Sequence, residues 1–112
     1  MNATIYHNPK CSTSRAVLQI LREAGNEPRI VEYLKTPLSR KELASLAKRL
    51  GSAEALLRAK EPLAAELGLK QASEDVVLDA IAEHPVLFNR PVVVTEKGAR
   101  ACRPAETVLG LL

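Results

Sequence analysis

Residues 3–33 read ATIYHNPKCSTSRAVLQILREAGNEPRIVEY, and this stretch decides the fold. Residues 3–6 form a short apolar segment, which is typical of a buried strand. After residue 15, apolar side chains recur at the spacing of an α-helix. Gly25 follows the last of them and is a typical helix-ending residue. Residues 29–33 form a second candidate strand. A strand, a helix and a strand within about thirty residues predict a βαβ unit with parallel strands.

Cys11 lies between the first predicted strand and the helix, among turn and cap residues rather than core residues. A thiol at a helix N-terminus faces unpaired backbone N–H groups and the positive end of the helix dipole, and both favour the thiolate. The same position binds oxyanions, and His7, Lys10 and Arg15 add cationic character nearby. The segment therefore predicts a nucleophile with an anionic substrate. The alternative is that this cysteine is a small buried hydrophobe.

The middle of the chain, residues 37–85, is predicted to be helical. Ser39 and Glu42 form a capping box ahead of one amphipathic helix. Residues 52–69 are weakly patterned and are predicted to hold one or two short helices. Ser73 is predicted to cap a further helix.

The end of the chain predicts a hairpin and a helix. Residues 91–95 form a strongly apolar strand, residues 96–98 a turn, and residues 99–102 an antiparallel return strand. Pro104 is predicted to open a last helix. The side chains predicted to face inward are Val108, Leu109 and Leu112. The predicted fold class is therefore α/β, with a mixed sheet built as βαβ and then ββα in a single domain, residues 1–112.

The composition excludes several classes of protein. The 112 residues carry 16 basic and 13 acidic side chains, with a formal net charge of +3, which indicates a solvated surface rather than a nucleic-acid tract. Aromatic residues make up 3%, too few for a base-stacking surface. No apolar run approaches the roughly 20 residues that span a bilayer, and no signal peptide opens the sequence. We therefore expect a cytoplasmic monomer without nucleic-acid or membrane partners.

The two cysteines, Cys11 and Cys102, lie far apart, and Ser14 occupies the position where a C-x-x-C motif places its second cysteine. Because the cytoplasm is reducing, a structural disulfide is disfavoured. An oxidised Cys11 must then be resolved by a thiol of another molecule. The spacings of histidine and cysteine predict no metal site, and no phosphate loop or dinucleotide fingerprint is present.

The run from residue 7 to residue 15, HNPKCSTSR, resembles the motif of the arsenate reductase (ArsC) family, the glutathione- and glutaredoxin-coupled kind. The resemblance covers the whole chain through further blocks, which are LLR at 56–58 with ELGL at 66–69, HPVLFNRPVVV at 84–94 and CRPAE at 102–106. It implies a thioredoxin-like fold with a helical insertion over about residues 37–85. It also implies arsenate reductase activity, no bound cofactor, glutathione as co-substrate and glutaredoxin as a partner.

The resemblance makes Cys11 the catalytic nucleophile and places the oxyanion-binding arginines at Arg58, Arg90 and Arg103. Two like unit charges about 4 Å apart repel by roughly 4 kcal/mol at an effective dielectric of about 20, so an anionic thiol needs cations to meet an anionic substrate. Planar guanidinium groups fit tetrahedral oxyanions with paired hydrogen bonds. Pro91 falls where thioredoxin-like folds place a cis-proline facing the cysteine. The alternatives are solvated surface arginines and an ordinary trans-proline.

Four residues around the thiol are candidates for supporting roles. His7 either stabilises the thiolate as an imidazolium or orients the loop through a hydrogen bond. Asn8 shapes the turn through its amide. Ser14 either donates a hydrogen bond to the thiolate or serves the first helical turn, and Arg15 lies near the anion or faces solvent. Cys102 is expected to serve packing.

Two other functions stay open from the sequence. Spx-like proteins of the same superfamily bind RNA polymerase and regulate transcription, but they typically carry a C-x-x-C switch where this chain has Ser14. A relative that uses glutathione for thiol transfer without acting on arsenate is the third hypothesis. It stays open because Ser12 occupies the position where many arsenate reductases have glycine.

Overall fold

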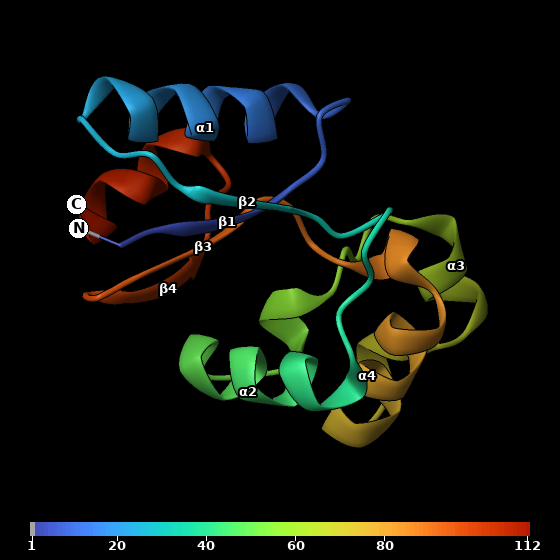
Figure 1. Ribbon diagram of the computed structural model, residues 1–112. Coiled ribbons are helices and arrows are strands. Elements are labelled where there is room, and N and C mark those ends of the chain that lie inside the picture. Colours follow the sequence, from blue (N-terminus) through green and yellow to red (C-terminus); the bar gives the residue numbers. More distant parts are fainter. Residues whose placement is uncertain (1) are drawn as a thin grey trace. The chain divides into compact units, whose positions relative to one another are not determined.

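The computed structural model describes residues 2–112. Their contacts divide them into two compact units, residues 2–36 with 90–112, and residues 37–89. The first unit contains β1 (Thr4–His7), α1 (Ser12–Glu23), β2 (Arg29–Glu32), β3 (Val92–Thr95), β4 (Gly98–Ala101) and the 3₁₀ helix η4 (Ala105–Leu111). The second contains α2 (Arg40–Leu50), η1 (Glu54–Leu56), α3 (Pro62–Glu66), η2 (Leu69–Gln71), α4 (Glu74–Glu83) and η3 (Pro85–Leu87), as labelled in part in Figure 1.

The first unit is built on a four-stranded mixed sheet with the order β2-β1-β3-β4. β1 and β2 run parallel, which confirms the predicted βαβ unit. β3 is antiparallel to both β1 and β4, which confirms the predicted hairpin. Tyr6 pairs with Val92, so the residues just before β3 lie beside the C-terminal end of β1. The loop that leads to Cys11 starts at that same end.

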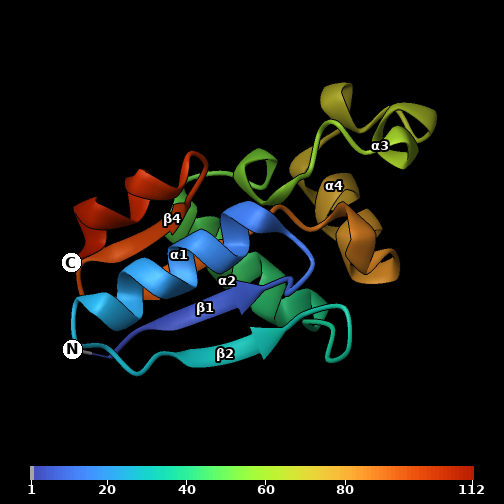
Figure 2. The ribbon, with the colours of Figure 1, turned by 90° about the horizontal axis from the view of Figure 1, so that it is seen from above.

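The core of the first unit lies between the sheet and two helices. α1 and η4 lie side by side on one face of the sheet, as Figure 2 shows from above. Ile5 and Val93 of the sheet and Leu21 of α1 are fully buried. Burying one such side chain contributes about 1.5–3 kcal/mol. The whole cluster consists of Ala3, Ile5, Val17, Leu21, Val93, Cys102, Val108 and Leu111.

The last helix differs from its prediction. It is a 3₁₀ helix, in which side chains three residues apart share a face. Val108 and Leu111 therefore point into the core, whereas Leu109, which was expected inside, is 57% exposed. The prediction was wrong because it assumed the 3.6-residue period of an α-helix. Leu112 packs partly against the core, as expected.

The second unit begins with the predicted capping box. The Ser39 side chain accepts a hydrogen bond from the Glu42 backbone N–H, and the Glu42 side chain accepts one from the Ser39 N–H. Gly51 ends α2 in the left-handed region, with φ of +99°. α2 packs against α4, and the Arg40 guanidinium donates to carboxylates of α4 at 2.7 Å and 3.0 Å. The weakly patterned stretch over residues 52–69 holds η1 and α3, which agrees with the predicted one or two short helices, and η2 begins at its last residue.

Removing the N-cap side chain of α2 tests whether the capping box stabilises the protein. Ser39→Ala is expected to lower the free energy of unfolding by about 1 kcal/mol, because the Glu42 backbone N–H loses the Ser39 hydroxyl that accepts its hydrogen bond. Chemical denaturation monitored by circular dichroism measures the change. Ser12→Ala is the control, since its exposed side chain opens α1 without a capping hydrogen bond. Equal losses in both variants would contradict the assignment.

Candidate active site

Cys11 is the N-cap residue of α1. Its backbone is extended, with φ of −92° and ψ of 122°, and its carbonyl accepts the first helical hydrogen bond from the Arg15 N–H at 3.0 Å. The Cys11 N–H donates to the Asn8 carbonyl at 3.0 Å, which closes the preceding turn. The first turn of α1 holds no acidic residue. The half-buried sulfur therefore sits at the positive end of the helix with no carboxylate in that turn.

The environment lowers the pKa of the Cys11 thiol. Partial burial acts first and raises the pKa, because it disfavours the charged thiolate. The backbone N–H of Ser14 and the guanidinium of Arg103 oppose it by donating hydrogen bonds to the sulfur. The positive charge of Arg90 and the backbone N–H of Thr13 add to this effect. The contributions that lower the pKa outweigh the effect of burial, so the thiolate of Cys11 forms at a lower pH than that of an ordinary cysteine.

Arg103 reaches the sulfur from the far end of the chain. Its Nη1 lies 3.6 Å from Cys11 Sγ and donates to the Arg90 carbonyl at 3.1 Å. The β3–β4 hairpin makes this contact, because its register carries Arg103 opposite Arg90 where the two strands separate. The Arg90–Pro91 peptide bond is cis, as the resemblance implies. The Arg103–Pro104 bond is also cis, which sequence reasoning did not anticipate.

His7 and Ser14 form a buried pair beside the thiol. His7 Nδ1 lies 2.5 Å from Ser14 Oγ, and the Asn8 backbone N–H donates to the same oxygen at 3.1 Å. Burial, with help from the charges of Arg15 and Arg22, lowers the pKa of His7, while Glu32 opposes the shift. A neutral imidazole bonded to a hydroxyl fits the loop-orienting role rather than the imidazolium role. Ser14 reaches the sulfur through its backbone N–H.

Asn8 and Arg15 hold the turn before the thiol. The Asn8 side-chain oxygen accepts a hydrogen bond from the Lys10 N–H at 3.0 Å, an Asx-type turn that agrees with its predicted role. Arg15 Nη1 donates to the Pro9 carbonyl at 2.9 Å. Arg15 is exposed, as the solvent-facing alternative expected, and its bond to the loop is a contact that neither predicted alternative described.

Arg58 belongs to the second unit, whereas the site residues described so far belong to the first. Its guanidinium forms an ion pair with Glu61 at 3.2 Å. Its backbone N–H donates to the Leu87 carbonyl at 2.7 Å, beside the bridge between Leu57 and Phe88. The oxyanion-binding role of Arg58 stays a prediction.

Cys102 is a core residue. Its side chain is fully buried in the cluster under α1 and η4, as the packing interpretation predicts. Burial raises the pKa of the Cys102 thiol to about 11, although the charge of Arg100 acts in the opposite direction. The pKa shifts of the two thiols therefore have opposite directions, and Cys11 is expected to be the more reactive of the two.

This contrast predicts selective alkylation. At neutral pH, iodoacetamide is expected to modify Cys11 of the native protein and to leave Cys102 unmodified, because Cys11 is accessible and has a lowered thiol pKa, whereas Cys102 is buried and has a raised one. Peptide mass spectrometry after timed quenching measures the two rates. In denaturant both cysteines should react, which provides the control. Comparable rates for the two thiols in the native protein would contradict the prediction.

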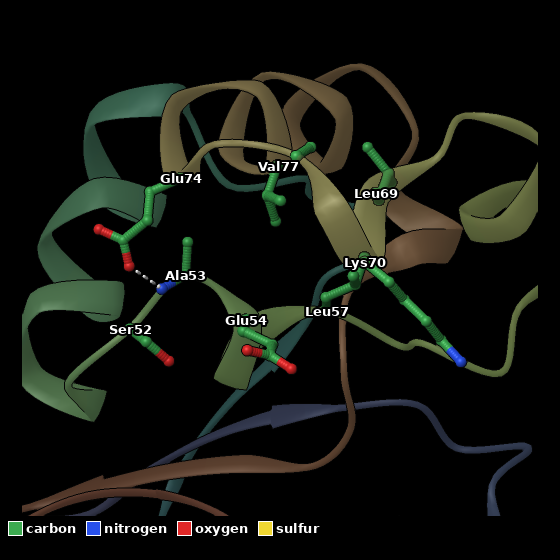
Figure 3. A pocket seen from close by; sticks show the side chains of 9 residues that line it. Ser52, Ala53, Glu54, Leu57, Leu69, Lys70, Glu74 and Val77 are labelled. Carbon is green, nitrogen blue, oxygen red and sulfur yellow. Dashed lines mark hydrogen bonds between the residues drawn. The ribbon is translucent and has the colours of Figure 1, made fainter.

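A cavity of about 120 Å³ lies within the second unit (Figure 3). Leu57, Leu69 and Val77 are among its apolar lining residues, and the Glu74 carboxylate at its edge accepts a hydrogen bond from the Ala53 N–H at 2.9 Å. None of the predicted site residues lines it. The predicted nucleophile Cys11 instead lies at the N-terminus of α1, with two of the predicted arginines beside it. The predicted supporting residues that surround it are His7, Asn8, Ser14 and Arg15.

The ArsC family model matches residues 6–111. The chain belongs to the ArsC family. Arsenate reductase of Escherichia coli K12 is 48% identical, over 99% of this chain and 81% of its own length. Arsenate reductase of Rhizobium meliloti is 50% identical, over 100% of this chain and 82% of its own length.

A solved structure of the same family supports the fold. An arsenate reductase from Vibrio cholerae superposes with a TM-score of 0.93 at 46% identity, covering 100% of this chain and 98% of that one. The predicted thioredoxin-like α/β fold of the ArsC family is thereby confirmed. Across residues 2–112, no helix is both long and apolar enough to traverse a bilayer. In the same residues, no three side chains among His, Cys, Asp and Glu cluster as a metal site would require.

Proposed function

We propose that this protein is an arsenate reductase whose nucleophile is Cys11. The observation that carries the proposal is the contact between Arg103 Nη1 and Cys11 Sγ at 3.6 Å, at a helix N-terminus, in a member of the ArsC family. A thiolate held between backbone N–H groups and a guanidinium is a nucleophile in a site that attracts anions. Arsenate is such an anion, and the curated relatives at 48–50% identity are named arsenate reductases.

The first step is attack of the Cys11 thiolate on arsenic. A sulfur–arsenic bond forms, one arsenic–oxygen bond breaks, and the departing oxygen leaves as hydroxide or water. Both reactants are anionic, so the approach costs electrostatic repulsion that the surrounding cations offset. Arg90 and Arg103 stand at the thiol and supply positive charge there, and we assign Arg58 the same task for the oxyanion. Donors already in place before charge shifts are the most effective stabilisers of a transition state.

The remaining steps use thiols from outside the chain. The glutathione thiolate adds to arsenic and a second oxygen leaves as water, so that arsenic carries both sulfurs. A glutaredoxin thiolate then attacks the glutathione sulfur and leaves as a mixed disulfide with glutathione. The bond pair between that sulfur and arsenic stays on arsenic, which passes from As(V) to As(III). Hydrolysis of the bond to Cys11 releases arsenite and restores the thiol.

The positions of the two cysteines support an external reductant. Cys102 is fully buried in the core, and Ser14 stands where a second cysteine of a C-x-x-C motif would lie. We therefore assign glutathione as co-substrate, glutaredoxin as partner and no resident cofactor. The reaction is placed in the cytoplasm, where glutathione keeps thiols reduced. The polymerase-binding alternative lacks the dithiol switch that it would use.

A coupled assay tests the proposal. Purified protein, arsenate, glutathione, glutaredoxin, glutathione reductase and NADPH are combined, and arsenite is quantified alongside NADPH oxidation. Omitting glutaredoxin or glutathione should each abolish turnover. No arsenite formation in the full mixture would overturn the proposal. NADPH oxidation that proceeds equally without arsenate would favour the glutathione-dependent thiol-transfer alternative.

A further inference from the structure

Hydrogen bonds hold the turn before Cys11 at two places, its base at Asn8 and its crest at Pro9. At its base, Asn8 makes three hydrogen bonds, accepting from the Lys10 and Cys11 backbone N–H groups and donating its own N–H to Ser14 Oγ. At its crest, the Pro9 carbonyl accepts from Arg15 Nη1 at 2.9 Å. Proline lacks an N–H, so this carbonyl is the backbone hydrogen-bonding group that Pro9 offers. Arg15 therefore links the crest of the turn to the first turn of α1.

The two arginines nearest the turn have different partners. Arg103 donates directly to the Cys11 sulfur, and its charge-assisted bond lowers the pKa of that thiol. Arg15 donates instead to a backbone carbonyl, that of Pro9. Its exposed side chain donates a hydrogen bond to the loop. The geometry therefore indicates that Arg15 holds the loop before Cys11 in place and does not bind the anion.

We infer that Arg15 is a positioning residue for the reaction, which holds the Pro9 carbonyl and thereby keeps Cys11 at the N-cap of α1. The arsenate readout of this inference rests on the proposed function, whereas the thiol readouts do not. Without the bond to Pro9, the turn keeps the hydrogen bond between the Asn8 N–H and Ser14 Oγ, but the Pro9 carbonyl loses its link to α1. The sulfur then samples positions away from the Ser14 N–H and Arg103. A misplacement of about 1 Å costs on the order of 100-fold in rate where reacting groups must align.

The test compares Arg15→Met with Arg15→Lys and with Arg22→Met. Arg22 is exposed on the same helix, and its charge lowers the pKa of His7 as that of Arg15 does, but it does not contact Pro9. We expect Arg15→Met to lower kcat about tenfold, with the KM for arsenate within about twofold of the original protein. Arg15→Lys keeps one donor and should recover part of kcat. Arg22→Met should match the original protein.

The thiol is followed in the same variants without arsenate. Thiolate absorbance against pH and the rate of iodoacetamide alkylation report on Cys11 directly. We expect a higher titration midpoint and slower alkylation at neutral pH for Arg15→Met alone, because its sulfur loses contact with the donors that favour the thiolate. Thermal unfolding verifies folding, and Arg15→Gln replaces the methionine variant if the latter does not fold.

The outcomes separate the hypotheses. A raised KM for arsenate at unchanged kcat would overturn the inference and make Arg15 an anion-binding residue. Unchanged values in every readout, or equal losses in Arg15→Met and Arg22→Met, would also overturn it. If no protein turns over arsenate but the thiol readouts change as expected and lysine restores them, the proposed function fails while the positioning role stands.

Discussion

Replacing Cys11 by serine is expected to abolish arsenate turnover, with a loss on the order of 10⁴-fold or more. The hydroxyl is not ionised at neutral pH, whereas the surroundings of the thiol lower its pKa and favour the anion. An oxygen nucleophile also forms no sulfur–arsenic bond for glutathione and glutaredoxin to resolve. Arsenite formation in the coupled assay measures the effect.

Cys102→Ala is the matched control for this variant. It removes the other thiol of the chain, which is fully buried and has a pKa of about 11. It is expected to keep turnover per folded molecule and to lose some stability, because a buried side chain is truncated. The assignment of Cys11 would be wrong if Cys11→Ser kept measurable turnover. The assignment of Cys102 to the core would be wrong if Cys102→Ala lost turnover while remaining folded.

Replacing Arg103 by methionine is expected to lower kcat/KM by about 10²-fold, the size of the loss when one preorganised donor is removed from a charged transition state. The variant also loses the hydrogen bond to Cys11 Sγ, so the pKa of the thiol should rise. The direction is fixed because Arg103 favours the charged form of the sulfur. Activity should therefore begin at a higher pH than in the original protein. Steady-state kinetics and thiolate absorbance, both measured against pH, test the two effects.

Arg100→Met controls for the loss of one positive charge from the same hairpin. Arg100 is an exposed residue of β4, and the arginines that lower the pKa of Cys11 are Arg103 and Arg90. Arg103→Lys keeps the charge but loses the planar fork, and it should fall between the original protein and the methionine variant. An unchanged thiol pKa in Arg103→Met would show that the contact at 3.6 Å does not act on the sulfur in solution.

Elements with local signals were predictable from the sequence. The capping box of Ser39 and Glu42 and the left-handed Gly51 both lie where the residue types indicate, because caps depend on a few neighbouring residues. The same holds for Cys11, which lies at the start of α1. The last helix also had a local signal, but its 3₁₀ period had none. Pro104 marks where this helix begins. Its three-residue period, which leaves Leu109 exposed, depends on how the helix packs against the sheet.

The chemistry of the site divides in the same way. The sequence by itself determined that a single thiol stands at a helix N-terminus, because strand, turn and helix signals are continuous around Cys11. Only the tertiary structure decided which cation reaches the sulfur, since Arg103 lies 92 positions away and arrives through the pairing of β1 with β3 and β3 with β4. It also directed Arg15 to Pro9. Side-chain hydrogen bonds depend on where folding places both partners, and spacing along the chain does not encode that placement.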